Sequence, residues 1–165
     1  MAKDTILVEP LTRAAFAPFG QVIELEGAEH FSINAGAAER YHALAAVEVR
    51  GESAHAVISL VRGRPRSLPL VLSFVERHPL GSQAFHPLSQ HPFLVVVAPD
   101  EGGKPGRPRA FRTSPGQGVN YAAGTWHGIL APLEAECDFL VVDRTGDGDN
   151  CEEHHFAEPW TIVAT

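Results

Sequence analysis

The chain has little cysteine and little positive charge, and both shortages exclude classes of protein. Its two cysteines among 165 residues, Cys137 and Cys151, are too few for a disulfide framework and lack the spacing of a metal site. We expect them to be reduced thiols, as in a cytoplasmic protein. A formal net charge of −7 and an isoelectric point near 5.7 argue against a nucleic-acid partner.

Membrane segments and common enzyme motifs are also missing. No apolar run approaches the ~18 residues of a membrane span, and the first residues do not resemble a signal peptide, so no membrane partner is expected. There is no Gly-x-Ser-x-Gly nucleophile elbow, no phosphate-binding loop ending in Lys and no dinucleotide fingerprint. Residues 147–150 resemble half of a calcium loop, but the bidentate Glu is missing and we predict a surface turn.

Turn residues, in contrast, are abundant. The 15 glycines and 13 prolines are scattered between short apolar runs, which is typical of a turn-rich β protein. One short helix is predicted over residues 13–16, capped by Thr12. Strands are predicted over residues 21–25, 43–50, 54–62, 70–77, 93–98, 109–113, 118–122, 127–131 and 138–144. We therefore predict a single domain over residues 1–165 that is all-β and mainly antiparallel, either a sandwich or a barrel.

Two of the predicted strands contain runs, residues 94–97 and 139–142, that are apolar on both faces. The outer face of a monomeric barrel should meet water, so such runs indicate a sheet that is covered on both sides. A homodimer that packs sheet against sheet would cover them, and we expect a homodimer for this reason.

The nine histidines differ in their local sequence. Three have no polar partner nearby in the sequence and are expected to be surface or half-buried residues: His30, His55 and His91. His154 and His155 lie in an acidic stretch that we predict to be a flexible tail without chemical function. Spacing alone leaves His42 undecided. His78 and His127 stand out, because each is embedded in Gly and Pro turn sequence and has polar neighbours.

These two histidines belong to two separate polar clusters. His127 ends the segment 116–127, whose glycines suit a strand, a tight turn and a returning strand with the imidazole as its first inward residue. In the segment 76–83, Glu76 and His78 are two residues apart and share one face of a strand. A small barrel that brought both clusters into its lumen would gather acid, base and ligand groups there.

The clusters resemble the motifs of a known family. Residues 116–127 are similar to the second cupin motif, and residues 76–83 occupy the frame of the first. Six strings together resemble the ureidoglycolate lyase family: INAG (33–36), RYH (40–42), ERHPLGSQAF (76–85), GQGVNY (116–121), GTWH (124–127) and DFLVVDR (138–144). The family usually has a second His and a Pro after the motif histidine, where this chain has Gly128 and Ile129, so His127 is itself the expected functional imidazole.

The resemblance implies a cupin-like β-barrel or jelly roll and a lyase that splits ureidoglycolate into glyoxylate and urea in allantoin catabolism. This substrate is a hemiaminal, so its collapse needs a base for the hydroxyl proton, an acid for the departing nitrogen and a cation for the carboxylate. We predict His78 and His127 as the proton-transfer pair, with Glu76 orienting them or acting as a second carboxylate. The predicted substrate-binding residues are Asn34, Gln83 and Tyr121 for the ureido group and Arg40 or Arg77 for the carboxylate.

The same side chains could bind a metal, and the residues leave this open. The candidate ligands offer donor types that suit nickel, manganese or zinc: Glu76, His78, Gln83 and His127. The resemblance implies stimulation by a divalent ion, nickel among the candidates, while acid–base catalysis without metal is the rival. Two other functions also stay open: a cupin that only binds a small carboxylate or sugar, and a metal-dependent oxygenase or isomerase. The single His within residues 76–83 argues against the oxygenase.

Overall fold

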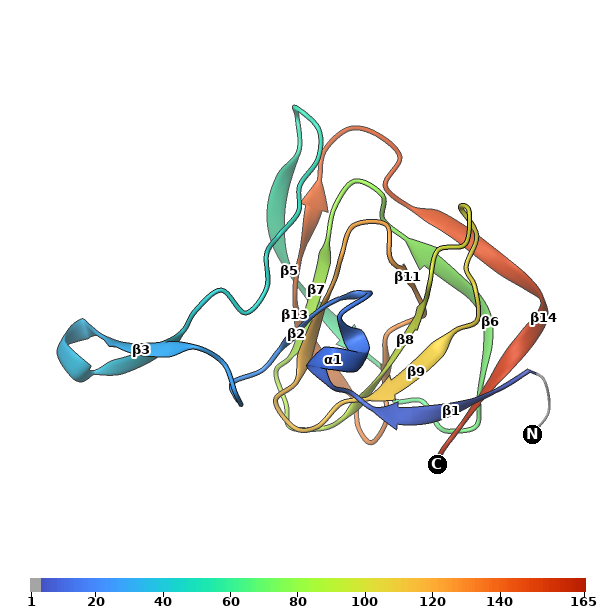
Figure 1. Cartoon of the computed structure of the whole chain (residues 1–165), viewed down its shortest axis with the longest axis horizontal. Helices are drawn as coiled ribbons and strands as arrows, with labels where there is room; N and C mark the ends of the chain where they lie inside the picture. Colours follow the sequence, from blue (N-terminus) through green and yellow to red (C-terminus); the bar gives the residue numbers. More distant parts are fainter. Residues whose placement is uncertain (1–3) are drawn as a thin grey trace.

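The computed structural model describes residues 4–165, and most of its regular structure is β-strand (Figure 1). The strands are β1 (Thr5–Pro10), β2 (Gly20–Ile23), β3 (His30–Ile33), β4 (Ala38–Tyr41), β5 (His55–Gly63), β6 (Leu70–Arg77), β7 (Gln83–Pro87), β8 (Phe93–Ala98), β9 (Arg109–Arg112), β10 (Gly118–Tyr121), β11 (Trp126–His127), β12 (Ala131–Pro132), β13 (Cys137–Thr145) and β14 (Glu152–Val163). The described helices are α1 (Arg13–Phe16) and the short 3-10 helix η1 (Asn34–Gly36). No helix in the described part of the chain is long and apolar enough to cross a membrane.

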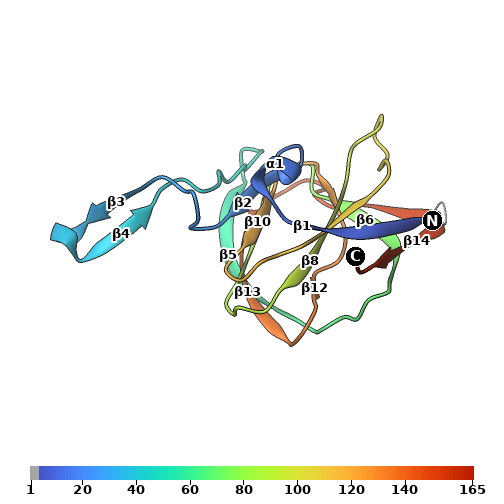
Figure 2. The same cartoon turned by 60° about the horizontal axis from the view of Figure 1, so that its bottom comes forward.

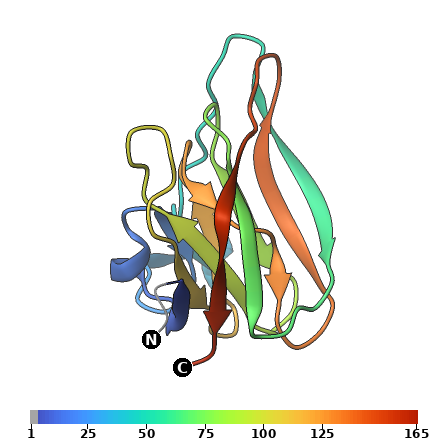
Figure 3. The ribbon, with the colours of Figure 1, turned by 90° about the vertical axis from the view of Figure 1, so that its right-hand side faces the viewer.

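Seven strands form one sheet, in the order β11-β6-β14-β1-β9-β8-β12. Because β11 pairs with β6 on one side and with β8 on the other, six of these strands close into a ring. In Figure 3 the red β14 and the green β6 run side by side along this ring. The parallel pairs in residues 4–165 are β1 with β14 and β1 with β9. The prediction of an all-β, mainly antiparallel, cupin-like barrel with one short N-terminal helix is confirmed.

A second sheet of five strands, β2-β10-β7-β13-β5, packs against this ring. The core between them contains buried aromatic rings, among them Phe111 of β9 and Phe139 of β13. A second core fills the ring and draws residues from all six of its strands. In β8, Val95 joins the first core and Val96 the second, so the run 94–97 is buried on both faces within one chain. The expectation that this run needs a dimer to cover it is therefore wrong.

β3 and β4 form a separate hairpin, here called the arm (residues 30–41), which projects away from both sheets (Figures 1 and 2). Its turn contains η1, where Asn34 and Ala35 have positive φ angles of 52° and 54°. The two strands of the arm pair only with each other among the described strands. With only four residues per strand, their alternation is too short to stand out in the sequence, and the arm was not predicted.

The predicted strand over residues 43–50 is wrong. The structure has only an isolated bridge there, between Val49 and Gly81. Two kinds of hydrogen bond hold the segment: the N–H of Arg50 donates to the carbonyl oxygen of Leu80 at 2.9 Å, and Asn120 Nδ2 donates to the carbonyl oxygen of Ala46 at 3.0 Å. The segment therefore covers β10 rather than joining a sheet, and a run rich in alanine and valine suits that position as well as a strand.

The predicted flexible tail is also wrong, because residues 152–163 form β14, the longest described strand. β14 lies between β6 and β1 in the seven-stranded sheet. Pro159 falls within a register shift between His155 and Trp160, where its missing N–H breaks no regular ladder. Charged residues at the start of β14 concealed a strand whose partners are distant in sequence.

The predicted strand over residues 127–131 is interrupted. β11 ends at His127 and β12 begins at Ala131, while Gly128 between them donates its N–H to the carbonyl oxygen of Val96 at 2.9 Å. This break matters for function, because it turns the carbonyl oxygen of Gly128 toward the His127 ring.

Candidate active site

A cavity of about 170 Å³ lies between the two sheets. Its polar lining comes from both: Glu76 and His127 on the ring side, and Gln83 and Tyr121 on the side of the five-stranded sheet. The other lining residues are Val61, Phe85, Gly128 and Leu130. A larger surface depression of about 400 Å³ beside β9 contains no histidine. The two polar clusters predicted to meet inside the barrel therefore do meet.

His127 is buried and has the geometry of a neutral base. Its Nδ1 lies 3.1 Å from the carbonyl oxygen of Gly128. A carbonyl only accepts, so the ring proton resides on Nδ1 and the lone pair on Nε2. Nε2 is buried without a hydrogen-bond partner among the described residues. Burial, with a smaller effect from the nearby His78, lowers the pKa of His127 to about 4.

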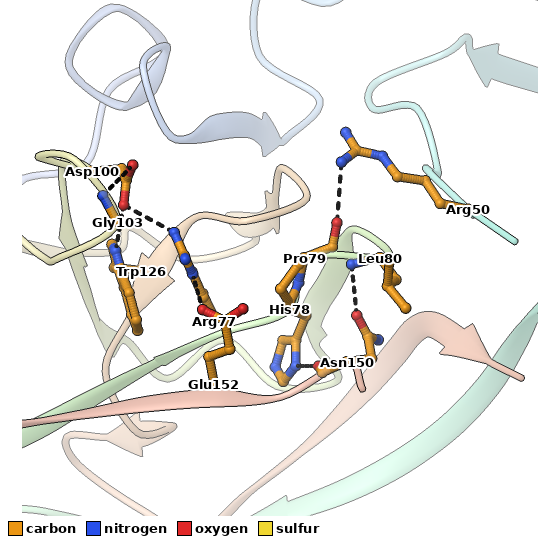
Figure 4. Close-up of polar contacts among 10 residues, drawn as sticks. All are labelled: Arg50, Arg77, His78, Pro79, Leu80, Asp100, Gly103, Trp126, Asn150 and Glu152. Carbon is orange, nitrogen blue, oxygen red and sulfur yellow. Dashed lines mark hydrogen bonds and ion pairs between the residues drawn. The ribbon is translucent and has the colours of Figure 1, made fainter. Parts of the chain in front are cut away.

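His78 follows directly after β6 and has the geometry of a cationic acid. Its Nδ1 donates to the carbonyl oxygen of Asn150 at 2.7 Å (Figure 4), and its Nε2 lies 3.7 Å from Glu76 Oε1. Burial lowers the pKa of His78, but Glu76 and the Asn150 carbonyl together outweigh burial and raise the pKa above 6.5. The ring centres of His78 and His127 are 5.2 Å apart. Neighbouring groups with oppositely displaced pKa values are the usual sign of an acid and its base.

Glu76 and Tyr121 flank the two imidazoles. The interaction with His78 holds the pKa of Glu76 below its ordinary value, against the opposing effect of burial, so Glu76 is ionised at neutral pH. The Tyr121 ring stacks on His127, with ring centres 4.5 Å apart and planes at 8°. Burial raises the pKa of the Tyr121 phenol, which therefore keeps its proton. The site thus holds one carboxylate near the cation and one aromatic ring against the base.

Gln83 presents an amide oxygen to the cavity. Its Nε2 donates to Asp143 Oδ2 at 3.1 Å, and its Oε1 is buried without a partner among residues 4–165. An ionised carboxylate only accepts hydrogen bonds, so Asp143 must face the NH₂ end of the amide. Gln83 Oε1 is therefore held as an acceptor for a donor group in the cavity.

Two residues of this arrangement were not predicted. Asp143 had a usable signal, because strand alternation places it on the same inner face as Phe139 and Val141. Asn150 ends the segment 147–150, which was predicted only as a surface turn. Its carbonyl oxygen anchors His78 and its side chain accepts from the N–H of Leu80 at 2.8 Å (Figure 4).

Three predicted substrate-binding residues lie outside this cavity. Arg77 lies on β6 next to Glu76 and pairs with Asp100 Oδ1 at 2.9 Å and Glu152 Oε2 at 2.7 Å (Figure 4). Two carboxylates occupy its guanidinium and Arg77 does not line the cavity, so the structure does not bring it to the other predicted site residues. Asn34 and Arg40 are exposed on the arm, which projects away from the two sheets of its own chain (Figure 1).

The donor set of the site fits a divalent cation. Glu76, His78 and His127 place their candidate ligand atoms within 4.8 Å of one another. Each imidazole anchors Nδ1 on a backbone carbonyl, and neither Nε2 has a hydrogen-bond partner among the described residues. Metal-binding histidines have this arrangement, because the anchored N–H orients the ring. Two imidazoles and a carboxylate are suitable ligands for first-row divalent metals, and Gln83 Oε1 lies in the same cavity.

Known proteins resemble this chain along nearly its whole length. It is 61% identical to the ureidoglycolate lyase of Chelativorans sp. strain BNC1, over 95% of both chains. Identity is 57% to ureidoglycolate lyase 2 of Rhizobium meliloti strain 1021, over 94% of this chain and 95% of that one, and 58% to the ureidoglycolate lyase of Mesorhizobium japonicum, over 95% and 96%. A solved dTDP sugar isomerase from Desulfovibrio desulfuricans G20 is similar only distantly, with a TM-score of 0.43 and 18% identity over 83% of this chain and 85% of that chain. The sequence model of ureidoglycolate lyase matches residues 3–163, and the chain belongs to that family.

Proposed function

We propose that this protein is a lyase that cleaves ureidoglycolate into glyoxylate and urea, a step in the breakdown of allantoin. Its relatives carry the name of this activity. The observation that carries the proposal is the pair of His78 and His127, 5.2 Å apart, with pKa values displaced in opposite directions. The reaction needs one base and one acid and has no net redox change, and this pair supplies both groups.

The chemistry is a proton transfer coupled to bond cleavage. Ureidoglycolate carries a hydroxyl, a carboxylate and a ureido nitrogen on one carbon. Nε2 of neutral His127 takes the hydroxyl proton, the carbonyl of glyoxylate forms, and the carbon–nitrogen bond breaks. The electron pair of that bond moves to the nitrogen, which takes a proton from Nε2 of His78 and leaves as urea. His127 gains one proton and His78 loses one; proton exchange with solvent then restores both histidines, and no water is consumed.

The neighbouring side chains support these two roles. Glu76 keeps His78 protonated at neutral pH, because its carboxylate stabilises the imidazolium. Gln83 Oε1 accepts a hydrogen bond from the NH₂ of the ureido group, and Asp143 holds it in that orientation. Tyr121 covers one face of His127 and keeps the base desolvated.

A divalent cation is the alternative occupant of the same donors, because a nitrogen that binds a metal cannot also transfer a proton. Glu76, His78 and His127 would hold it, with Gln83 as a further oxygen donor. Nickel is the candidate that the family resemblance implies. When bound, such an ion would act as a Lewis acid toward the substrate's oxygen atoms. Activity that survives exhaustive chelation, with no metal in elemental analysis, would assign the reaction to the side chains alone.

The proposal is tested with purified protein and racemic ureidoglycolate, with glyoxylate and urea followed together. We expect the two products in equal amounts, at the same rate with and without oxygen. Two histidines and one carboxylate also match the ligands of iron oxygenases, although residues 76–83 alone contain a single histidine. Oxygen-dependent turnover would therefore contradict the lyase, and binding without turnover would favour a ligand-binding cupin.

We also propose that the protein is cytoplasmic and forms a homodimer. Both cysteines, Cys137 and Cys151, are free thiols, which suits a reducing compartment. The run 139–142 has buried Phe139 and Val141 on one face, but its outer residues lie beside exposed Ile58 and Leu60. A second copy of the chain would cover this apolar strip.

A further inference from the structure

Among the described residues, no guanidinium or ammonium group lines the cavity to pair with the substrate carboxylate. Ureidoglycolate is a carboxylate, and this inference rests on the proposed function for that reason. Glu76 lines the cavity instead, and Asp143 lies behind Gln83. His78 is not among the lining residues of the cavity. Arg144, the buried arginine of β13, already donates to the carbonyl oxygens of Arg50 and Asp147. Within residues 4–165, a single chain therefore offers the substrate carboxylate no arginine or lysine at this cavity.

The arm carries a guanidinium on its apolar face. Phe31 is the register partner of Arg40, and Ile33 is the register partner of Ala38, so these four side chains share one face. Phe31 is 44% exposed, and Arg40 is exposed with no ion pair or hydrogen bond to the described residues. A two-stranded hairpin alone is marginally stable in water. Packing against another surface would bury the apolar face of this hairpin and stabilise it.

The matching surface lies on the edge of the five-stranded sheet. Ile58 and Leu60 of β5 are 73% and 68% exposed, and their register partners on β13 are Val142 and Leu140. Val61, the next residue of β5, lines the cavity and is itself partly exposed, so the cavity opens beside this strand. A long apolar edge strand is an unusual feature in a soluble protein unless something covers it. The arm leaves the barrel on the same side as β5 (Figures 1 and 2).

We propose that the arm of one chain docks on β5 and β13 of a second copy and carries Arg40 to the mouth of the partner's cavity. Phe31 would pack against Ile58 and Leu60, and the guanidinium would bind the substrate carboxylate through two parallel hydrogen bonds. The arrangement is reciprocal, so a twofold dimer has two arms and two complete sites. It also balances charge, because each cavity contributes Glu76 and the substrate adds a second carboxylate.

The test compares two heterodimers that carry the same two substitutions, either on different chains or on the same chain. Two different affinity tags, one on each chain, allow each heterodimer to be purified. In the first heterodimer, one chain carries Arg40→Ala and the other His127→Ala. The chain with an intact His127 then receives Arg40 from its partner, and we expect about half of the wild-type rate, since one site of two is complete. In the second heterodimer, one chain carries both substitutions and the other none. Its intact cavity receives no Arg40, and we expect kcat/KM about 10- to 100-fold below that of the first.

The opposite ranking of the two heterodimers would show that Arg40 serves its own chain and would overturn the proposal. A wild-type protein that sediments as a monomer at micromolar concentration would also overturn it. Glu39→Ala is the matched control, because Glu39 pairs with Ser32 on the other face of the arm and the substitution should leave the rate and the dimer unchanged. If wild-type protein releases no urea, the proposed function fails, whereas dimer loss in Phe31→Asp tests the docking without any assay of turnover.

Discussion

The wall of the cavity formed by β6 and β11 carries ionisable groups, whereas the wall formed by β7 and β10 carries neutral ones. Glu76 and His127 lie on the first wall, with His78 directly after β6, and Gln83 and Tyr121 lie on the second. Backbone carbonyls anchor both imidazoles, and a carboxylate anchors the amide of Gln83. The first kind of anchor decides where protons reside, and the second decides which end of an amide faces the substrate.

This difference separates the chemical step from recognition. Groups that change protonation during the reaction act on kcat, because their interactions strengthen in the transition state. Groups that only hold the substrate act equally in the ground state and the transition state, and therefore act on KM. The two walls should therefore respond differently to substitution: kcat should change on the first wall and KM on the second.

The largest effect is expected for the base. His127→Ala should lower kcat by ~10²–10⁴-fold with little change in KM, because no other lining residue in the described part of the chain has an imidazole. Steady-state kinetics on ureidoglycolate measure the change, and a thermal melt checks that the fold is kept. His55→Ala on the exposed start of β5 is the control and should behave as wild type. A rise in KM with an unchanged kcat would show that His127 binds the substrate and does not transfer the proton.

The pH profile of kcat/KM should show the titration of both imidazoles. In the metal-free protein, kcat/KM should rise with pH as His127 loses its proton near its pKa of about 4, and fall at a pH above 6.5 as His78 loses its own. Glu76→Gln should move the alkaline limb to lower pH, because Glu76 raises the pKa of His78. Rates measured from pH 4 to pH 9 in buffers of constant ionic strength would show this. If the alkaline limb of the Glu76→Gln variant stayed at the wild-type pH, Glu76 would not be the group that raises the pKa of His78.

Stability should depend on pH through the same buried base. In the unfolded chain His127 has a pKa near 6.5, and in the folded chain about 4. Its contribution to the free energy of unfolding is therefore fully present above pH 6.5 and is lost as the pH falls toward 4. At about 1.4 kcal/mol per pKa unit, the loss amounts to about 3 kcal/mol. His78, with its raised pKa, has the opposite sign and loses its contribution as pH rises through its folded pKa.

Urea denaturation at pH 4.5 and pH 7 measures this change in the free energy of unfolding. His127→Phe keeps a ring against Tyr121 but has nothing to titrate, so its acid-side slope should be shallower than that of wild type. His55→Phe, a change at an exposed residue, should keep the wild-type slope. Equal slopes for wild type and His127→Phe would contradict burial of the imidazole in its neutral form.

The pairing of the two polar clusters could be predicted from sequence because short-range rules decide it. Alternation along a strand places Glu76 and His78 on one face, and the glycines before His127 fit the turn that precedes β11. The same rule also places Arg77 on the opposite face from Glu76, so its loss from the site was predictable. What alternation does not give is the pKa of each imidazole, since burial and anchoring carbonyls come from segments distant in sequence.

The errors in the fold have one physical origin. The segment 43–50 and β14 differ from what their sequences predict because their partners, not their own residues, decide their structure. Residues 43–50 look like a strand but cover β10, and residues 152–163 look like an acidic tail but fill a place between β6 and β1. Propensity is a weak guide where tertiary partners dominate.

The smallest effect is expected on the neutral wall. Gln83→Ala should raise KM about 10-fold with kcat nearly unchanged, because it removes one hydrogen bond to the substrate and no protonation step. Asp143→Asn should raise KM less, about twofold, because an amide at residue 143 can pair with either end of Gln83 and lets the glutamine turn its NH₂ toward the cavity in part of the molecules. Steady-state kinetics at pH 6, where His78 stays protonated, separate this from any change in the pKa of His78. A fall in kcat with an unchanged KM in Gln83→Ala would show that Gln83 acts in the chemical step. The two walls of the cavity would then not differ in function.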